Sequence, residues 1–159
     1  MTMKPKVYLE TTIVSYLTAR PSRDLIIAGH QQITQEWWDS QRDNYELFIS
    51  QPVLTEAGMG EPLMAQSRLA VLNSLNLLAT TGEALALAKK LIAPGPLPIK
   101  AATDALHIAL AAHHGLDYLL TWNCKHIANA QMWPRINVLC LMQGYQPPTI
   151  CTPEELSGV

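Results

Sequence analysis

Short apolar runs alternate along the chain with longer segments of helical periodicity. The runs predict five strands, over residues 7–9, 47–49, 77–79, 118–120 and 138–141. Each run is apolar at consecutive rather than alternate positions, which is typical of a parallel sheet covered on both faces. The segments between them predict helices over 11–18, 24–42, 52–58, 62–75, 83–92 and 99–114.

Strands that alternate with helices place the chain in the α/β class, because right-handed crossovers then connect parallel strands. We predict a three-layer α/β/α sandwich with a mostly parallel central sheet of about five strands. The 159 residues suit a single domain, 1–159, in which Pro147-Pro148 begins a polar tail. Sites in such folds lie at the carboxyl ends of the strands.

Composition narrows the classes of partner and compartment. Hydrophobic residues make up 48% and charged residues 15%, which excludes a disordered chain. The net charge of -2 provides no strong field for nucleic acid, so contacts with one would be local. Three separated cysteines, no leader pattern over 1–6 and polar interruptions within 101–120 favour a cytoplasmic protein that neither carries a signal peptide nor crosses a membrane.

Four polar positions fall near one edge of the predicted sheet. Glu10 follows the first strand, and Glu56 lies in the helix after the second. Asp104 lies in the helix before the fourth strand, and Asn123 lies just beyond that strand. The helix of Asp104 is otherwise largely apolar, so its carboxylate would be buried unless it paired with Lys100, four residues earlier. Simple exposure to solvent is the alternative for the two glutamates.

Carboxylates gathered at one dry edge repel one another unless a cation neutralises them or their pKa values rise. Ligands that are all oxygen favour Mg²⁺ or Mn²⁺ over zinc. Such ions activate water and stabilise the negative charge that develops in phosphodiester hydrolysis. The pattern therefore suggests metal-dependent phosphodiester cleavage.

Four segments, in order, resemble the motifs of PIN domains. They are VYLETT at 7–12, SQPVLTE at 50–56, ATDALHIA at 102–109, which is the strongest match, and LLTWN at 119–123. Glu10 stands where the family normally has Asp, and Asn123 takes a position often held by Asp. The resemblance covers a core of about 4–142, leaving 143–159 as a C-terminal tail, in which 152–156 resembles the ending of many bacterial members.

The resemblance implies a PIN-like nuclease fold and a ribonuclease that uses Mg²⁺ or Mn²⁺. Many bacterial members are VapC-type toxins of toxin–antitoxin pairs, each held inactive by a cognate antitoxin. The implied metal ligands are Glu10, Glu56 and Asp104, and Asn123 would assist through a water or a direct oxygen contact. The hydroxyl groups implied to hydrogen-bond the carboxylates or the water are those of Thr11, Thr12 and Thr121.

Two further classes of protein stay open at this point. The longer Glu10 and the neutral Asn123 also suit a degraded PIN-like module that binds RNA or a protein without cutting. A receiver or phosphohydrolase domain is the third class, although the DxDxT pattern is missing after the first strand. For the nuclease we expect an RNA substrate, an antitoxin and a homodimer, with Lys125 touching a phosphate and His107 either facing RNA or hydrogen-bonding Asp104.

Overall fold

A computed structural model describes residues 3–158 of the chain. Residues 1–2, part of the segment in which no leader is expected, and residue 159 lie outside the described residues. Within residues 3–158 five strands form one sheet: β1 (Lys6–Leu9), β2 (Glu46–Ser50), β3 (Asn76–Leu78), β4 (Tyr118–Leu120) and β5 (Thr149–Cys151). Their order is β3-β2-β1-β4-β5, and every neighbouring pair is parallel.

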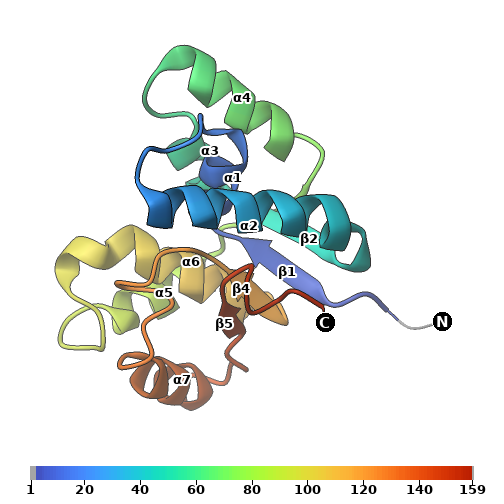
Figure 1. Ribbon diagram of the computed structural model, residues 1–159. Helices are drawn as coiled ribbons and strands as arrows, with labels where there is room; N and C mark the ends of the chain where they lie inside the picture. The colour runs from blue at the N-terminus through green and yellow to red at the C-terminus, as the bar shows by residue number, and fades with distance from the viewer. Residues whose placement is uncertain (1–2, 159) are drawn as a thin grey trace.

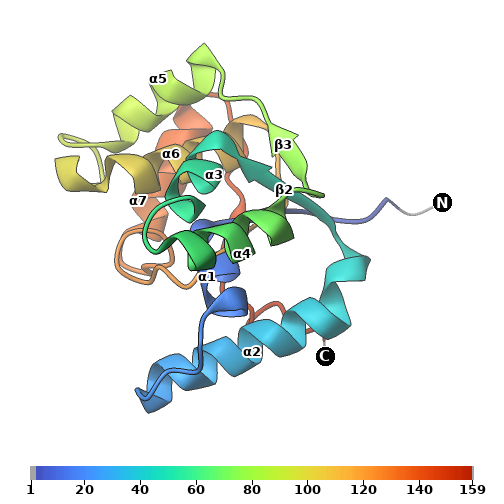
Figure 2. The same ribbon diagram turned by 90° about the horizontal axis from the view of Figure 1, so that it is seen from above.

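Helices cover both faces of the sheet, as the sequence predicts. One face carries α1 (Thr11–Thr18), α2 (Leu25–Gln41), α3 (Gln51–Ala57) and α4 (Pro62–Leu72). The other carries α5 (Gly82–Leu91), α6 (Ala102–His113) and α7 (Trp133–Met142) (Figure 1). Short 3₁₀ turns cover Arg42–Asn44 and Ile99–Ala101. Figure 2 shows β3 beside β2 at the sheet edge. The three-layer prediction is confirmed.

Local sequence signals explain where several of the helices begin and end. Ser50 caps α3 by accepting a hydrogen bond from the backbone of Val53, and Pro52 occupies the first turn of that helix. Gly115, which follows α6, has a φ of +69°, a left-handed conformation that favours glycine. The β2–α3 connection is therefore tight, which places the first turns of α3 directly beyond the end of β2.

The core explains why α6 is apolar around its circumference. Residues 107–111 of this helix are all buried, because α6 packs between the sheet and α5. Val7 of β1 and Leu119 and Leu120 of β4 are also fully buried, as continuous apolar strands in a sheet covered on both faces should be. The polar side chains of α6 that enter this interior therefore need partners within the protein.

The predicted fifth strand is wrong. Residues 138–141 belong to α7, and the fifth strand is formed by Thr149–Cys151 instead. A short apolar run fits a buried helix as well as a strand, and periodicity alone does not separate them. The segment expected to be a tail thus pairs with β4 and also buries Leu156, whose carbonyl accepts a hydrogen bond from Trp37 Nε1 at 2.8 Å. Within the described residues, none of the helices is both long and apolar enough to span a bilayer.

Candidate metal centre

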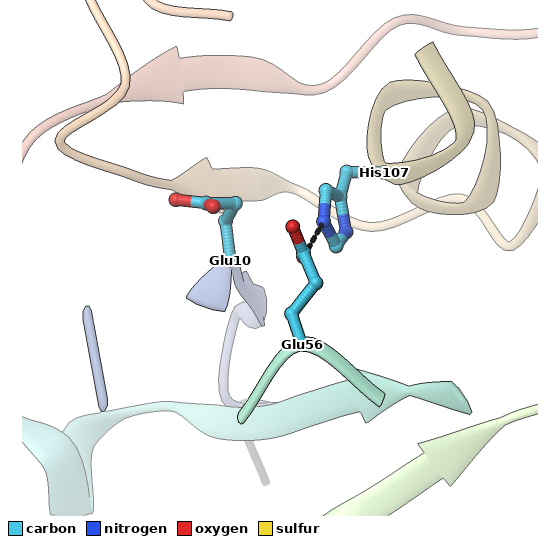
Figure 3. A group of neighbouring side chains, drawn as sticks. All are labelled: Glu10, Glu56 and His107. Atoms are coloured by element: carbon cyan, nitrogen blue, oxygen red, sulfur yellow. Dashed lines mark hydrogen bonds and ion pairs between the residues drawn. The ribbon is translucent and has the colours of Figure 1, made fainter. Parts of the chain in front are cut away.

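Acidic residues from separate parts of the chain meet at the carboxyl edge of the sheet. Glu10 directly follows β1, and Glu56 projects from α3, the helix after β2. One potential ligand atom from each of Glu10, Glu56 and His107 forms a group in which all atoms lie within 4.8 Å of one another. Figure 3 shows the three side chains, which come from the end of β1, from α3 and from α6. The structure therefore brings together two of the three expected carboxylates.

The Glu10 carboxylate is buried and held through one of its oxygens. Its Oε1 accepts hydrogen bonds from Thr12 Oγ1 at 2.5 Å, Thr121 Oγ1 at 2.6 Å and the Thr12 backbone N–H at 3.2 Å. Glu10 is also the N-cap of α1, where the helix dipole favours a negative charge. The expected hydrogen bonds from these two threonines to a carboxylate are present.

The Glu56 carboxylate is held in a similar way. Its Oε1 accepts hydrogen bonds from Thr11 Oγ1 and from His107 Nε2, each at 2.7 Å. Burial raises the pKa of Glu56, but the hydrogen bonds from His107 and Thr11 and the electrostatic attraction of His107 outweigh it and leave the pKa below its usual value. Glu56 is therefore ionised at neutral pH, as a metal ligand must be, and it is not a freely exposed surface residue.

His107 is fully buried, so the expectation that it faces RNA is wrong. Its Nδ1 lies 2.6 Å from the Tyr8 hydroxyl, and its Nε2 is bonded to Glu56. Both ring nitrogens are thus occupied inside the protein. The alternative hydrogen bond from His107 to Asp104 does not form either, because Asp104 has other partners.

Asp104 lies outside the group of three close ligand residues. Its Oδ1 accepts a hydrogen bond from Asn123 Nδ2 and its Oδ2 pairs with His126 Nδ1, each at 3.0 Å. The Asn123 Oδ1 accepts from the backbone N–H groups of Lys125 and His126 at 3.2 Å, which folds the loop beyond β4. The Asp104 side chain is 20% exposed, so it is less buried than its apolar helix predicts.

No lysine or arginine neutralises these carboxylates within residues 3–158. The ion pair with Lys100 considered for Asp104 is absent, and the single Lys or Arg ion pair in that range joins Arg42 to Asp43. Two adjacent carboxylates without a cationic side chain are the environment that a divalent ion stabilises. Their oxygen ligands suit Mg²⁺ or Mn²⁺, so the donor set fits the expected metal.

Three residues of this network do not follow from the sequence as site residues: Tyr8, Ser50 and His126. A signal exists for Tyr8, because a tyrosine inside a fully apolar strand must place its hydroxyl on a partner. Ser50 is predictable as a helix cap but not as a partner of Tyr8, which it contacts at 2.7 Å. The pairing of His126 with Asp104 depends on the path of the loop after β4, for which the sequence carries no pattern.

Comparisons with known proteins support the fold. No protein-family model matches the sequence, and no curated protein matches it significantly. A chain of VapBC2 from Rickettsia felis, solved bound to a DNA fragment from their promoter, is similar with a TM-score of 0.58, 16% identity and coverage of 92% of this chain and 98% of that one. VapC20 of Mycobacterium tuberculosis, described as a Sarcin-Ricin loop cleaving toxin, is similar with a TM-score of 0.52, 14% identity and coverage of 71% and 86%. The chain therefore has a PIN domain fold of the VapC type.

Proposed function

We propose that this protein is a metal-dependent endoribonuclease and the toxin of a toxin–antitoxin pair. The observation that carries the proposal is the meeting of Glu10 and Glu56 at the carboxyl edge of a VapC-type fold, where no lysine or arginine among residues 3–158 neutralises them. The structural neighbour VapC20 is described as a toxin that cleaves the Sarcin-Ricin loop, which supports RNA as the substrate class.

In this proposal Glu10, Glu56 and Asp104 hold Mg²⁺ or Mn²⁺. When bound, such an ion supplies an activated water for attack on the phosphate and stabilises the negative charge that develops on the leaving oxygen. Asp104 would join the ion by exchanging one of its present hydrogen bonds, to Asn123 or to His126. Asn123 thus orients the Asp104 carboxylate through a hydrogen bond.

The three threonines have a positioning role in the proposed reaction. Thr12 and Thr121 donate hydrogen bonds to Glu10, and Thr11 donates to Glu56. Each hydroxyl fixes a carboxylate oxygen, so that little reorganisation is needed when the ion and the substrate arrive. The Trp122 backbone N–H in turn donates to Thr12 Oγ1 at 2.8 Å and ties the loop beyond β4 to the same network.

RNA and an antitoxin are the proposed partners. Lys125 is exposed two residues beyond Asn123, where its ammonium group would contact a phosphate of the substrate. The neighbour from Rickettsia felis is a VapBC2 structure bound to promoter DNA, which supports a cognate antitoxin for this chain as well. We also propose that the protein forms a homodimer and is located in the cytoplasm.

RNA cleavage by the purified protein tests the proposal. Wild type should cleave single-stranded RNA with Mn²⁺ and stop when EDTA is added. Glu56→Gln and Asp104→Asn should lose the activity, whereas Glu46→Gln, which alters an exposed glutamate at the opposite end of β2, should keep it. Cleavage that persists in EDTA, or equally in all four proteins, would remove the proposal. Binding of RNA without any cleavage would favour the degraded module.

A further inference from the structure

A buried chain of hydrogen bonds runs behind the proposed metal centre. It begins at Ser50 Oγ, which lies 2.7 Å from the Tyr8 hydroxyl, and continues 2.6 Å from that hydroxyl to His107 Nδ1. His107 Nε2 then contacts Glu56 Oε1 at 2.7 Å. Ser50, Tyr8 and His107 are all 0% exposed, so the chain excludes solvent until it reaches Glu56. It links β1, β2, α6 and α3 at one point of the fold.

The groups at the two ends of this series of hydrogen bonds, Ser50 and Glu56, determine which atom donates the proton at each step. Burial raises the pKa of Tyr8, so its hydroxyl keeps its proton. Ser50 Oγ accepts from the Val53 backbone N–H, which leaves its own proton free to go to the Tyr8 oxygen. The Tyr8 hydroxyl then donates to His107 Nδ1, and the ring proton on Nε2 is donated to Glu56. The reverse direction would leave the proton of Ser50 without an acceptor among residues 3–158.

Hydrogen-bond donors among residues 3–158 reach only one of the two carboxylate oxygens of Glu10 and only one of those of Glu56. All protein hydrogen bonds to Glu56 reach Oε1, and all those to Glu10 likewise reach Oε1. No donor within residues 3–158 reaches Oε2 of either residue. Asp104 differs, because each of its oxygens has a partner. Each of the two glutamates thus retains one oxygen that has no protein donor within the described part of the chain.

We propose that His107 is a positioning residue for Glu56 and not itself a metal ligand. Its Nε2–H, set by the hydrogen bond from Tyr8, holds Oε1 of Glu56 and leaves Oε2 for a divalent ion shared with Glu10. A ring nitrogen that carries a proton has no lone pair for a metal, so His107 acts through Glu56. The inference rests on the proposed function and names the residues that tune its metal affinity.

The test measures Mn²⁺ binding to the purified protein by electron paramagnetic resonance. His107→Leu removes the donor and should weaken Mn²⁺ binding by about 10- to 100-fold, the usual effect of losing an outer hydrogen bond to a ligand. His107→Gln keeps an N–H donor and should bind close to wild type. Tyr8→Phe removes the hydroxyl that orients the His107 ring, and its Mn²⁺ affinity should lie between those of His107→Leu and His107→Gln. His114→Gln is the matched control, since that histidine is hydrogen-bonded to the Ala79 carbonyl away from the site.

Pulsed measurements on the Mn²⁺ complex separate positioning from ligation. The proposal expects no nitrogen bound directly to Mn²⁺ in wild type. A directly coordinated nitrogen would overturn it, as would wild-type Mn²⁺ affinity in a folded His107→Leu protein. Circular dichroism shows whether His107→Leu folds. If it does not, His107→Gln and Tyr8→Phe carry the same comparison. Mn²⁺ binding by His107→Gln that is as weak as expected after the loss of a nitrogen ligand would count against the positioning role.

A second readout needs no metal and separates this inference from the proposed function. Nitrogen NMR of the metal-free protein should show His107 as the tautomer with its proton on Nε2. A proton on Nδ1 alone would overturn the hydrogen-bond chain and the positioning role with it. If the expected tautomer is seen but wild type binds no Mn²⁺, the metal-dependent function fails, and the role of His107 is reduced to holding Glu56 in a metal-free fold.

Discussion

Replacing Thr121 by valine removes one hydroxyl from the acidic edge and keeps the shape of the side chain. Thr121 is fully buried, and its Oγ1 donates to Glu10 at 2.6 Å while accepting from the Asn123 backbone N–H at 2.9 Å. The substitution therefore takes a donor from a buried carboxylate and an acceptor from the loop that carries Asn123. Both losses lower the free energy of unfolding.

The size of the effect follows from the charge of the acceptor. A hydrogen bond to an ionised group contributes about 1.5–3 kcal/mol, and a neutral one contributes about 1 kcal/mol. Glu10 keeps its two hydrogen bonds from Thr12, and the valine methyl group adds a little apolar burial, so the loss is partly compensated. We expect Thr121→Val to reduce the free energy of unfolding by about 2–3 kcal/mol.

Urea unfolding in EDTA measures this change without interference from metal. With a typical slope of about 1–3 kcal/mol per molar urea, the midpoint should fall by about 1 M or more. Thr121→Ser keeps the hydroxyl and should recover most of the loss. Thr18→Val is the control for the substitution itself, because the Thr18 hydroxyl donates to the Val14 carbonyl within α1, away from the acidic edge. It should change stability by less than about 0.5 kcal/mol. If Thr121→Val is as mild as Thr18→Val, the threonines do not hold Glu10 as described.

Metal binding, the burial of two cysteines and the phosphate contact of Lys125 each have a measurable consequence. Mn²⁺ at about 100 times its Kd should stabilise wild type by about 2.7 kcal/mol and raise its Tm by about 5–10 °C. The Tm of Glu10→Gln and of Glu56→Gln should not change when Mn²⁺ is added. A wild-type increase of Tm in both variants would contradict a shared ion. Burial raises the pKa of Cys140 to about 11 and that of Cys151 to about 12. A thiol reagent at about pH 8 should therefore label only the exposed Cys124 in the folded protein. Labelling of Cys140 and Cys151 should increase only as the pH rises toward these pKa values or when the protein unfolds. Rapid reaction of all three thiols at that pH would show that the fold around β5 and α7 is open. Lys125→Ala should weaken RNA binding evenly across sequences and reduce its salt dependence by about one counterion, and an unchanged salt slope would place Lys125 away from the phosphates.

Much of the fold is predictable from the sequence because local signals agree with the tertiary arrangement. Continuous apolar strands, the Ser50–Pro52 cap and Gly115 each indicate an element that the structure contains. Residues 138–141 show where such signals fail, because a short apolar run carries no information on the partner that will cover it. The true fifth strand, Thr149–Cys151, is too short and too close to two prolines to be recognised before its pairing with β4 is known.

The sequence likewise predicts the positions of some candidate site residues but not their hydrogen-bond partners. Topology places Glu10 and Glu56 at the same edge, and both are found there. The partners of their oxygens are set by side-chain directions that only packing determines, as for His107, which helical spacing places near Asp104 but which bonds Glu56 instead. The same holds for Asp104, whose hydrogen bonds come from the loop after β4 rather than from Lys100.

A divalent ion shared by Glu10 and Glu56 is central to the proposed activity. The most direct measurement is an anomalous difference map from a crystal of the protein soaked in Mn²⁺. The account predicts a peak at the carboxyl edge of the sheet, in contact with an oxygen of Glu10 and an oxygen of Glu56. An empty edge at saturating Mn²⁺, or an ion bound elsewhere while both carboxylates keep only their protein partners, would contradict it.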